Sequence, residues 1–250
     1  MKTYENFARV YDELMDNVPY EAWAEFLQKR LQEYGIAGGL MLDLACGTGK
    51  MTTLMAGRGF DMIGVDSSMD MLQIARERGL EKADSCLYLL QDMREFELYG
   101  TVRAVISVCD SINYVTEEED LLHVFSLVNN YLDPGGIFLF DFNTEHKYRD
   151  VVGESVIAED RDDVSFIWYN EYDEEEHLNY IDLSVFVQEK EDLFRKFQEQ
   201  HVQKGYTLER ICQLLKRAGL FFLRAYDGYT MEPAREDSER IVVAAREQGK

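Results

Sequence analysis

The sequence predicts an α/β protein built on a doubly wound, Rossmann-like, mostly parallel seven-stranded sheet, with an antiparallel β insertion after the fifth strand. Between residues 38 and 142, short apolar runs alternate with amphipathic helical stretches, which is the pattern of a parallel sheet buried on both faces. Residues 143–205 instead alternate apolar and polar side chains around an acidic turn, as antiparallel hairpins do. The first pattern returns afterwards. We therefore expect a core of residues 1–142 and 206–250 and an inserted β subdomain of residues 143–205.

The expected elements follow in order along the chain. Residues 3–32 are expected to be helical, with a break at Pro19, because Tyr4, Phe7 and Tyr11 recur at spacings of three and four. The first five strands are expected in "GLMLDLA", "DMIGVD", "SCLYLLQD", "RAVISVCD" and "GGIFLFDF". A hairpin is expected in "VSFIWYNEYDEEEHLNYIDLSVFVQEK", with one further strand on each side of it. The core then closes with "TLERICQLLKRAG" as a helix and with "LFFLRAYDG" and "SERIVVAARE" as strands.

Composition argues against several partners. The 250 residues include 48 Asp and Glu against 26 Lys and Arg, for a net charge of -22, and a field of that sign repels nucleic acids and anionic membranes. No apolar run reaches the roughly 18 residues of a membrane span. The four cysteines are scattered, which fits neither a disulfide framework nor a zinc site. We expect a cytoplasmic protein with no metal, nucleic-acid or membrane partner.

The stretch "LDLACGTGK" carries the main functional signal, because an acid, Asp43, precedes a small-residue loop at residues 45–49. A Walker phosphate loop does not fit, since Leu44 and Met51 stand where its first glycine and its magnesium-binding hydroxyl belong. The dinucleotide fingerprint is incomplete, because Thr52 replaces its third glycine. In addition, an acid at the tip of the first strand would repel a pyrophosphate. The loop and Asp43 together predict a ligand that carries positive charge and no phosphate.

S-adenosylmethionine has these properties, since it carries a sulfonium and an α-ammonium group. The stretch "LDLACGTG" resembles the first motif of the class I S-adenosylmethionine-dependent methyltransferases, acid-x-x-x-Gly-x-Gly. Further acids end the next two apolar runs, Asp66 in "DMIGVD" and Asp92 in "LLQDM". A carboxylate at Asp66 can accept the ribose hydroxyls. The resemblance implies that Asp92 and the backbone amide of Met93 contact adenine, and that "SVCDSINYV" faces the methyl group and the acceptor.

The N-terminal "YENFARVYDELM" is similar to the opening of a small-molecule subgroup of that family, Tyr-x-x-Phe-Ala-x-x-Tyr-Asp. In that subgroup the helix covers the cofactor, which implies contacts from Tyr11 and, with less support, from Tyr4. The spacing of Tyr4, Phe7 and Tyr11 fits equally well a helix that packs these side chains on the core without contacting the cofactor. Some members also carry a strand insertion after the fifth strand that roofs the acceptor pocket. The aromatic hairpin must pack on something, either as that roof or as a homodimer contact.

The expected site residues fall into two groups. The predicted cofactor-binding residues are Tyr11, Asp43, Ala45, Cys46, Gly47, Gly49, Asp66, Ser67, Met71, Asp92, Met93 and Cys109. On the acceptor side the candidates are Asp110 and Tyr114 for positioning and His146 as a base, with Asn113 and Asn143 on the same rim. His123, His177 and His201 are expected at the surface.

The predicted function is methyl transfer from S-adenosylmethionine to nitrogen or oxygen of a small molecule. Such a transfer is an in-line displacement that proximity and orientation can largely promote, and a base is needed only if the acceptor must lose a proton. Two alternatives remain open. One is a non-catalytic, S-adenosylmethionine-binding regulatory protein, and the other is a methyltransferase that acts on a protein or RNA.

Overall fold

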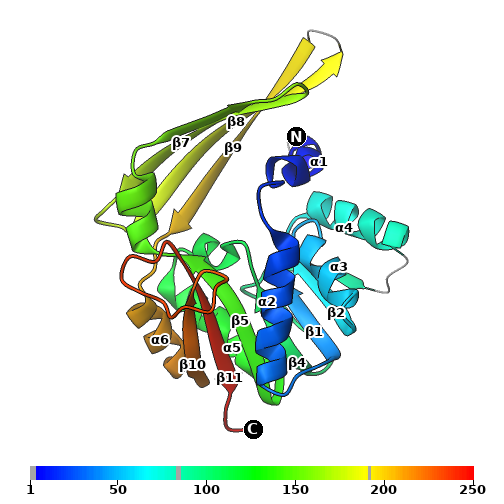
Figure 1. Ribbon diagram of the computed structural model, residues 1–250, viewed down its shortest axis with the longest axis vertical. Coiled ribbons are helices and arrows are strands. Elements are labelled where there is room, and N and C mark those ends of the chain that lie inside the picture. The colour runs from blue at the N-terminus through cyan, green and yellow to red at the C-terminus, as the bar shows by residue number, and fades with distance from the viewer. Residues whose placement is uncertain (1–3, 83–85, 191–192) are drawn as a thin grey trace.

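The computed structural model describes residues 4–82, 86–190 and 193–250 and contains two sheets (Figure 1). The larger sheet has seven strands in the order β10-β11-β5-β4-β1-β2-β3. Strands β1 to β5 pair in parallel, and β11 runs antiparallel to both β5 and β10. The strands are β1 (Gly39–Leu44), β2 (Phe60–Asp66), β3 (Leu87–Leu90), β4 (Val102–Ser107), β5 (Leu132–Asn143), β10 (Leu220–Asp227) and β11 (Arg240–Glu247). This mostly parallel, Rossmann-like sheet confirms the predicted fold class.

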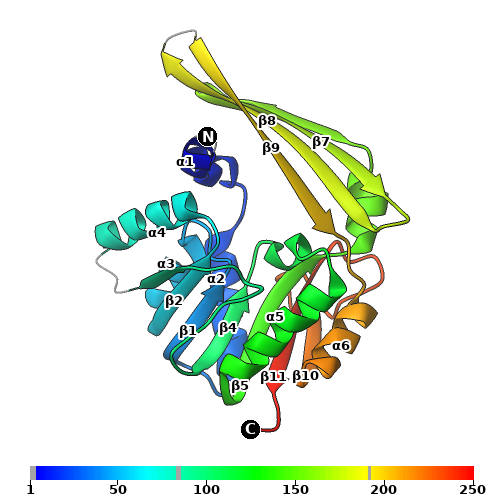
Figure 2. The ribbon, with the colours of Figure 1, turned by 180° about the vertical axis from the view of Figure 1, so that it is seen from behind.

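Helices cover both faces of this sheet (Figures 1 and 2). Helices α5 and α6 pack on one face, whereas α2 and α3 pack on the other. Strand β5 explains why both faces need cover: Phe138 and Phe140 lie in one core, and Ile137 and Leu139 lie in the opposite one. The helices are α1 (Tyr4–Leu14), α2 (Tyr20–Glu33), α3 (Lys50–Ala56), α4 (Met69–Lys82), α5 (Glu118–Tyr131) and α6 (Leu208–Arg217).

The smaller sheet follows β5 and is antiparallel, in the order β6-β7-β8-β9. Its strands are β6 (Val156–Asp160), β7 (Val164–Asp173), β8 (Leu178–Lys190) and β9 (Leu193–Lys204). The predicted hairpin is β7–β8, and the two flanking strands are β6 and β9. Because β5 continues to Asn143, the first residue of the predicted insertion belongs to the core sheet.

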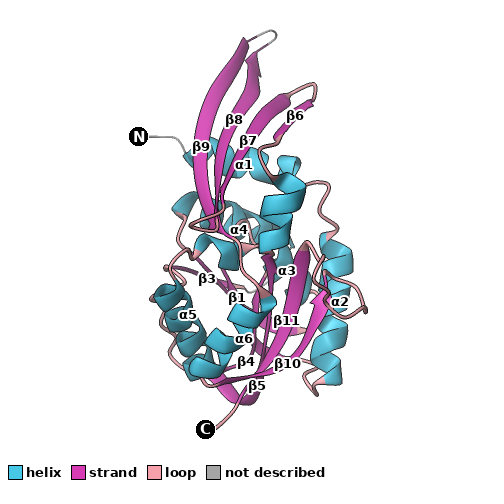
Figure 3. Cartoon of the chain, turned by 90° about the vertical axis from the view of Figure 1, so that its left-hand side faces the viewer, coloured by secondary structure: helices cyan, strands magenta, loops and turns pink. Residues whose placement is uncertain are grey.

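Helix α1 lies between the smaller sheet and α4 (Figure 3). Its Val10 is buried in an apolar cluster with Val164, Ile181, Leu183 and Val185 on the inner face of the smaller sheet. The helix therefore connects the two sheets on one side. No helix in the described ranges combines the length and apolar character needed to cross a membrane.

Candidate active site

A cavity of about 790 Å³ opens at the carboxyl ends of the parallel strands. Residues from β1, β2, the segment after β4, helix α1 and the inner face of the smaller sheet line it. This is the edge at which open α/β sheets bind their ligands. The predicted cofactor residues, with the exception of Gly49, all line the cavity: Tyr11, Asp43, Ala45, Cys46, Gly47, Asp66, Ser67, Met71, Asp92, Met93 and Cys109.

The two loop glycines differ in their surroundings. Both have a left-handed backbone, with φ of 54° at Gly47 and 70° at Gly49, a conformation that favours glycine. A Cβ at Gly47 would meet no heavy atom of the described chain within 4 Å, whereas one at Gly49 would lie 2.7 Å from the Tyr88 hydroxyl and 2.9 Å from the Ala75 Cβ. Gly47 thus leaves room for a ligand, and Gly49 gives the loop its shape by packing against α4 and β3.

Asp43 lies beneath the loop and is almost completely buried, at 1% exposure. The Thr52 hydroxyl donates to its Oδ2 at 2.6 Å. Its Oδ1 has no hydrogen-bond partner among the described residues. Burial, aided by the charge of Asp66 and opposed by the Thr52 hydrogen bond, raises the pKa of Asp43 to about 7. A cationic ligand group in the cavity would stabilise the ionised carboxylate.

Asp66 ends β2 and holds the loop in place. Its Oδ2 accepts the Gly47 N–H at 2.8 Å, and its Oδ1 accepts the Ser68 N–H at 2.8 Å. Burial raises the pKa of Asp66, and these amide hydrogen bonds oppose the shift. A carboxylate has about four acceptor sites, and the backbone amides of Gly47, Ser67 and Ser68 occupy three of them, so Asp66, which lines the cavity, can accept a further hydrogen bond from a ligand.

Asp92 lies two residues beyond β3, and its partner Arg94 was not anticipated. The Arg94 guanidinium donates to Asp92 Oδ1 at 3.0 Å from Nε and to Oδ2 at 2.6 Å from Nη2. The Arg94 backbone N–H also donates to Oδ1, at 2.8 Å. The hydrogen bonds from Arg94 lower the pKa of Asp92. Any contact of Asp92 with a ligand amino group would therefore be made by a carboxylate already oriented by Arg94.

The N-terminal helix is tied directly to the glycine loop. The Thr48 hydroxyl donates to Asp12 Oδ1 at 2.8 Å, and Arg78 on α4 forms an ion pair with the same carboxylate. Tyr11, the preceding residue, lines the cavity, and burial raises the pKa of its phenol. The side chains of Tyr4 and Phe7 lie outside the described part of the structure.

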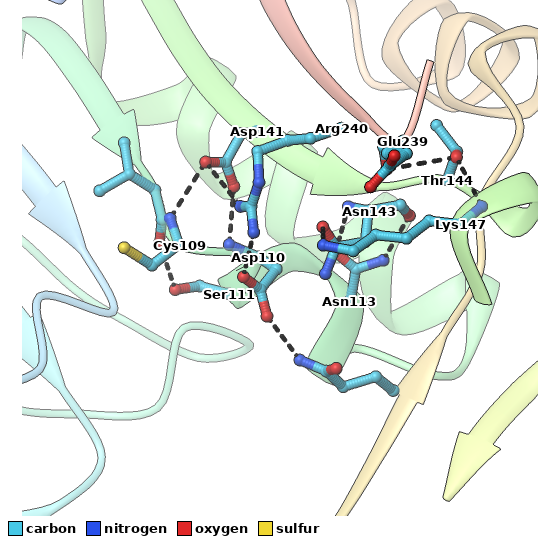
Figure 4. Close-up of polar contacts among 12 residues, drawn as sticks. Cys109, Asp110, Ser111, Asn113, Asp141, Asn143, Thr144, Lys147, Glu239 and Arg240 are labelled. Carbon is cyan, nitrogen blue, oxygen red and sulfur yellow. Dashed lines mark hydrogen bonds and ion pairs between the residues drawn. The ribbon is translucent and has the colours of Figure 1, made fainter. Parts of the chain in front are cut away.

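The rim after β4 is strained and strongly braced (Figure 4). Cys109 and Asp110 have φ of 59° and 53°, a conformation that costs non-glycine residues energy and is concentrated at functional sites. Asp141 accepts both of their backbone N–H groups, at 3.1 and 2.7 Å. Arg240 donates to Asp110 Oδ1 at 2.8 Å, and Gln203 donates to Oδ2 at 2.7 Å. Asp110 therefore lines the cavity as a carboxylate that is held in place by a hydrogen bond to each of its oxygens.

Asn113 joins the core to the smaller sheet and does not line the cavity. Its Nδ2 donates to the carbonyl oxygens of Asn143 at 2.8 Å and Lys204 at 2.7 Å, and its Oδ1 accepts the Asn143 N–H at 2.8 Å. Figure 4 shows the contacts between Asn113 and Asn143, and together with the bond to Lys204 they connect the end of β5 to the end of β9. Asn143 itself lines the cavity and accepts a hydrogen bond from Lys147 at 3.0 Å.

The structure corrects the expectations for two histidines. His146 is not among the described residues that line the cavity, and its Nδ1 lies 2.8 Å from Asp150 Oδ2. His201, which was expected at the surface, lines the cavity, and its Nδ1 lies 3.4 Å from the Tyr114 hydroxyl. Burial lowers the pKa of His201, although Asp110 opposes the shift. His123 is exposed, as expected.

Several residues that line the cavity were not expected from the sequence. They come from α2, the segment around residue 147, the smaller sheet and β11, and they include Tyr20, Lys147, Tyr148, Asn170, Asn179, Leu183, Glu199, Gln203 and Arg240. Phe166 and Trp168, which also line the cavity, belong to the aromatic hairpin that was expected as a possible roof. The alternation along β7, β8 and β9 predicts which of these side chains share a face, because every second side chain of a strand points the same way, but it does not predict which face turns toward the cavity.

This fold and this site define a class I S-adenosylmethionine-dependent methyltransferase. The buried acid with an unpaired oxygen, the open Gly47 and the acid that ends β2 fit the cationic nucleoside. Residues 41–136 match a family model described as a methyltransferase domain. The chain is also 35% identical to YqeM of Bacillus subtilis (strain 168), named as a methyltransferase, over 97% of this chain and 96% of the relative. The chain belongs to this methyltransferase family and uses S-adenosylmethionine.

Two further proteins extend the comparison. The crystal structure of an S-adenosylmethionine-dependent methyltransferase from Clostridium acetobutylicum ATCC 824 superposes with a TM-score of 0.91 at 29% identity, and the match covers 98% of this chain and 99% of that one. A dTDP-3-amino-3,4,6-trideoxy-alpha-D-glucopyranose N,N-dimethyltransferase from Streptomyces venezuelae is 34% identical over 101 residues, which is 40% of this chain and 41% of the relative.

Proposed function

We propose that the protein methylates a nitrogen or oxygen atom of a small molecule. The observation that carries the proposal is the continuous cavity, which extends from the glycine loop to the inner face of the smaller sheet, where polar and apolar side chains both line it. Its volume of about 790 Å³ lies within the range of roughly 300–1,000 Å³ that is common for small-molecule sites. In this proposal residues 143–205 form the roof of the acceptor half, and the predicted cofactor residues that line the cavity hold the nucleoside. The Streptomyces relative, whose name gives an amino sugar as acceptor, supports a small acceptor.

The chain's own groups would act mainly by positioning. S-adenosylmethionine, when bound, supplies a methyl group on a positively charged sulfur. Asp110, held by Arg240 and Gln203, and the Tyr114 hydroxyl would orient the acceptor atom for in-line attack. His201, whose pKa is lowered by burial, is neutral at pH 7 and can accept a proton from the acceptor. His201 replaces His146 as the base in this proposal because it lines the cavity next to Tyr114.

The acceptor class can be tested by S-adenosylhomocysteine formation. The protein is incubated with S-adenosylmethionine and with a cell extract that ultrafiltration has divided into small molecules and macromolecules. We expect product only with the small-molecule fraction. Product only with the macromolecular fraction would instead support a protein or RNA acceptor. Cofactor binding without product in either fraction would support the regulatory alternative.

The role of His201 predicts a specific kinetic change. Replacing His201 by Gln is expected to lower kcat by about 10²-fold or more, which is the usual contribution of a general base, and to leave S-adenosylmethionine affinity unchanged. In the wild type, kcat should fall only at pH values below about 6.5, the ordinary pKa of histidine, because burial lowers the pKa of His201. The exposed His123→Gln is the matched control. A His201→Gln variant with the wild-type kcat would refute the assignment.

A homodimer through the smaller sheet stays a prediction. Its outer face exposes large apolar side chains, among them Ile167, Tyr169, Tyr180 and Val202. Sedimentation equilibrium of the wild type and of an Ile167→Lys, Tyr180→Lys variant would show whether this face mediates association.

A further inference from the structure

Glu199 is an unexplained buried acid in the acceptor half of the cavity. It lies on β9, is 7% exposed and lines the cavity. Its Oε1 is buried and accepts no hydrogen bond from residues 4–82, 86–190 or 193–250. Burial raises the pKa of Glu199 and is the only cause of the shift. A buried carboxylate normally requires a partner, so this side chain is suited to a ligand that provides one.

The register of the smaller sheet places Glu199 in a row with an aromatic side chain. Glu199 pairs with Leu183 across β8 and β9, and Leu183 pairs with Trp168 across β7 and β8. Directly paired residues point to the same face, and Trp168, Leu183 and Glu199 all line the cavity. The Trp168 indole N–H donates to Asn170 Oδ1 at 2.8 Å, which fixes the ring. Glu199 stands at one end of this row and Trp168 at the other. A carboxylate and the face of an aromatic ring both attract cations.

The protein's own cations on this side of the cavity already have partners. Arg240 forms ion pairs with Asp110 and Asp141 at 2.8 and 3.0 Å. Lys147 donates to Asn143 Oδ1 at 3.0 Å. Neither contributes to the pKa shift of Glu199, which has burial as its sole cause. A cationic group of a ligand could therefore supply the charge that compensates Glu199.

We propose that Glu199 binds a positively charged amino group of the methyl acceptor, so that the acceptor is an amine-bearing small molecule held at two points. This inference rests on the proposed function and specifies its substrate class. The second point is the reacting atom, near Tyr114 and His201. His201 follows Glu199 by two residues on the same face of β9, a separation of roughly 7 Å along a strand. The bound ammonium group is thus distinct from the atom that receives the methyl group, and it stays protonated during the reaction.

Three sugars of similar size but different charge can test the proposal. Glucosamine, glucose and glucuronate are titrated into the full-length protein that has been saturated with S-adenosylhomocysteine, and binding is followed by ligand-observed NMR. The proteins are the wild type, Glu199→Gln and Glu171→Gln. Glu171 lies on β7 of the same sheet but is exposed on the outer face, so its substitution removes the same charge outside the cavity.

In the wild type and in Glu171→Gln, we expect glucosamine to bind about tenfold more tightly than glucose, as a charge-assisted hydrogen bond implies, and glucuronate to bind most weakly. Glu199→Gln should bind glucosamine and glucose equally. The proposal is overturned if wild-type protein shows no preference for glucosamine, including no binding of it, or if Glu199→Gln keeps the preference. Affinity for S-adenosylhomocysteine is measured separately. If the protein did not bind S-adenosylhomocysteine, the proposed function would be refuted, whereas the preference for glucosamine over glucose would still decide the role of Glu199.

Discussion

Asp43 is almost completely buried, accepts hydrogen bonds from Thr52 and has a pKa raised to about 7. An aspartate in the unfolded chain has a pKa near 3.9. Between these two values the native state binds more protons than the unfolded state, so the contribution of Asp43 to stability is lost as the pH rises through this window. Ionisation of Asp43 thus lowers the free energy of unfolding of the ligand-free protein. A cation that binds beside Asp43 would stabilise the ionised carboxylate.

Asp43→Asn should remove this pH dependence, because an amide imitates the neutral carboxyl. We expect the wild type to lose free energy of unfolding relative to the variant as the pH rises from about 4 to about 7, by up to roughly 4 kcal/mol. Urea unfolding of both ligand-free proteins across this range is the measurement. Parallel stability curves would show that the pKa of Asp43 is not raised in the folded protein.

Asp66 has two tasks, because it accepts the Gly47 and Ser68 amides and also lines the cavity. Asp66→Ala should weaken S-adenosylmethionine binding by roughly 1–3 kcal/mol, the scale of hydrogen bonds to a charged group. Asp61→Ala, on the same strand but exposed, should leave the affinity unchanged. Calorimetric titration compares the two variants. Wild-type affinity in Asp66→Ala would refute the role of this residue.

At the scale of elements, Asn113 holds the smaller sheet on the core. Three hydrogen bonds of 2.7 to 2.8 Å link its side chain to the ends of β5 and β9. Asn113→Ala would leave buried backbone groups without a partner, and we expect the free energy of unfolding to fall by about 2–4 kcal/mol. Asn130→Ala, which alters an exposed side chain on α5, should change it by less than about 0.5 kcal/mol. A similarly small change in the free energy of unfolding of both variants would contradict the proposal that Asn113 holds the smaller sheet on the core.

The elements also show how far the sequence could predict the site. The position of Asp43, Asp66 and Asp92 along one cavity was predictable because the carboxyl ends of parallel strands meet at one edge of the sheet. Glu199 and His201 were not, because alternation shows which side chains of a strand share a face but not which face turns toward the cavity. His146 was chosen for its place after β5, but it contacts Asp150 instead. The direction of such a loop side chain depends on tertiary contacts that sequence patterns do not contain.

At the scale of the whole molecule, segments far apart in the sequence enclose one cavity. Tyr11 comes from α1, Asp43 from β1, Asp110 from the rim after β4, His201 from β9 and Arg240 from β11. A ligand in this cavity would bind only the folded state and should stabilise the whole protein by an amount that grows with the logarithm of its concentration relative to its Kd. Most of the 48 acidic residues of the sequence lie outside this cavity. The selectivity for a cationic cofactor is therefore expected to depend on the few buried carboxylates.

Calorimetric titration of the wild type and of Asp43→Asn with S-adenosylmethionine and with NAD tests the central claim most directly. The account predicts that the wild type binds S-adenosylmethionine and not NAD. It also predicts that Asp43→Asn loses at least about tenfold in S-adenosylmethionine affinity, because a neutral amide no longer compensates the cationic ligand. Unchanged affinity in the variant, or binding of NAD by the wild type, would contradict the claim that Asp43 selects this cofactor by charge.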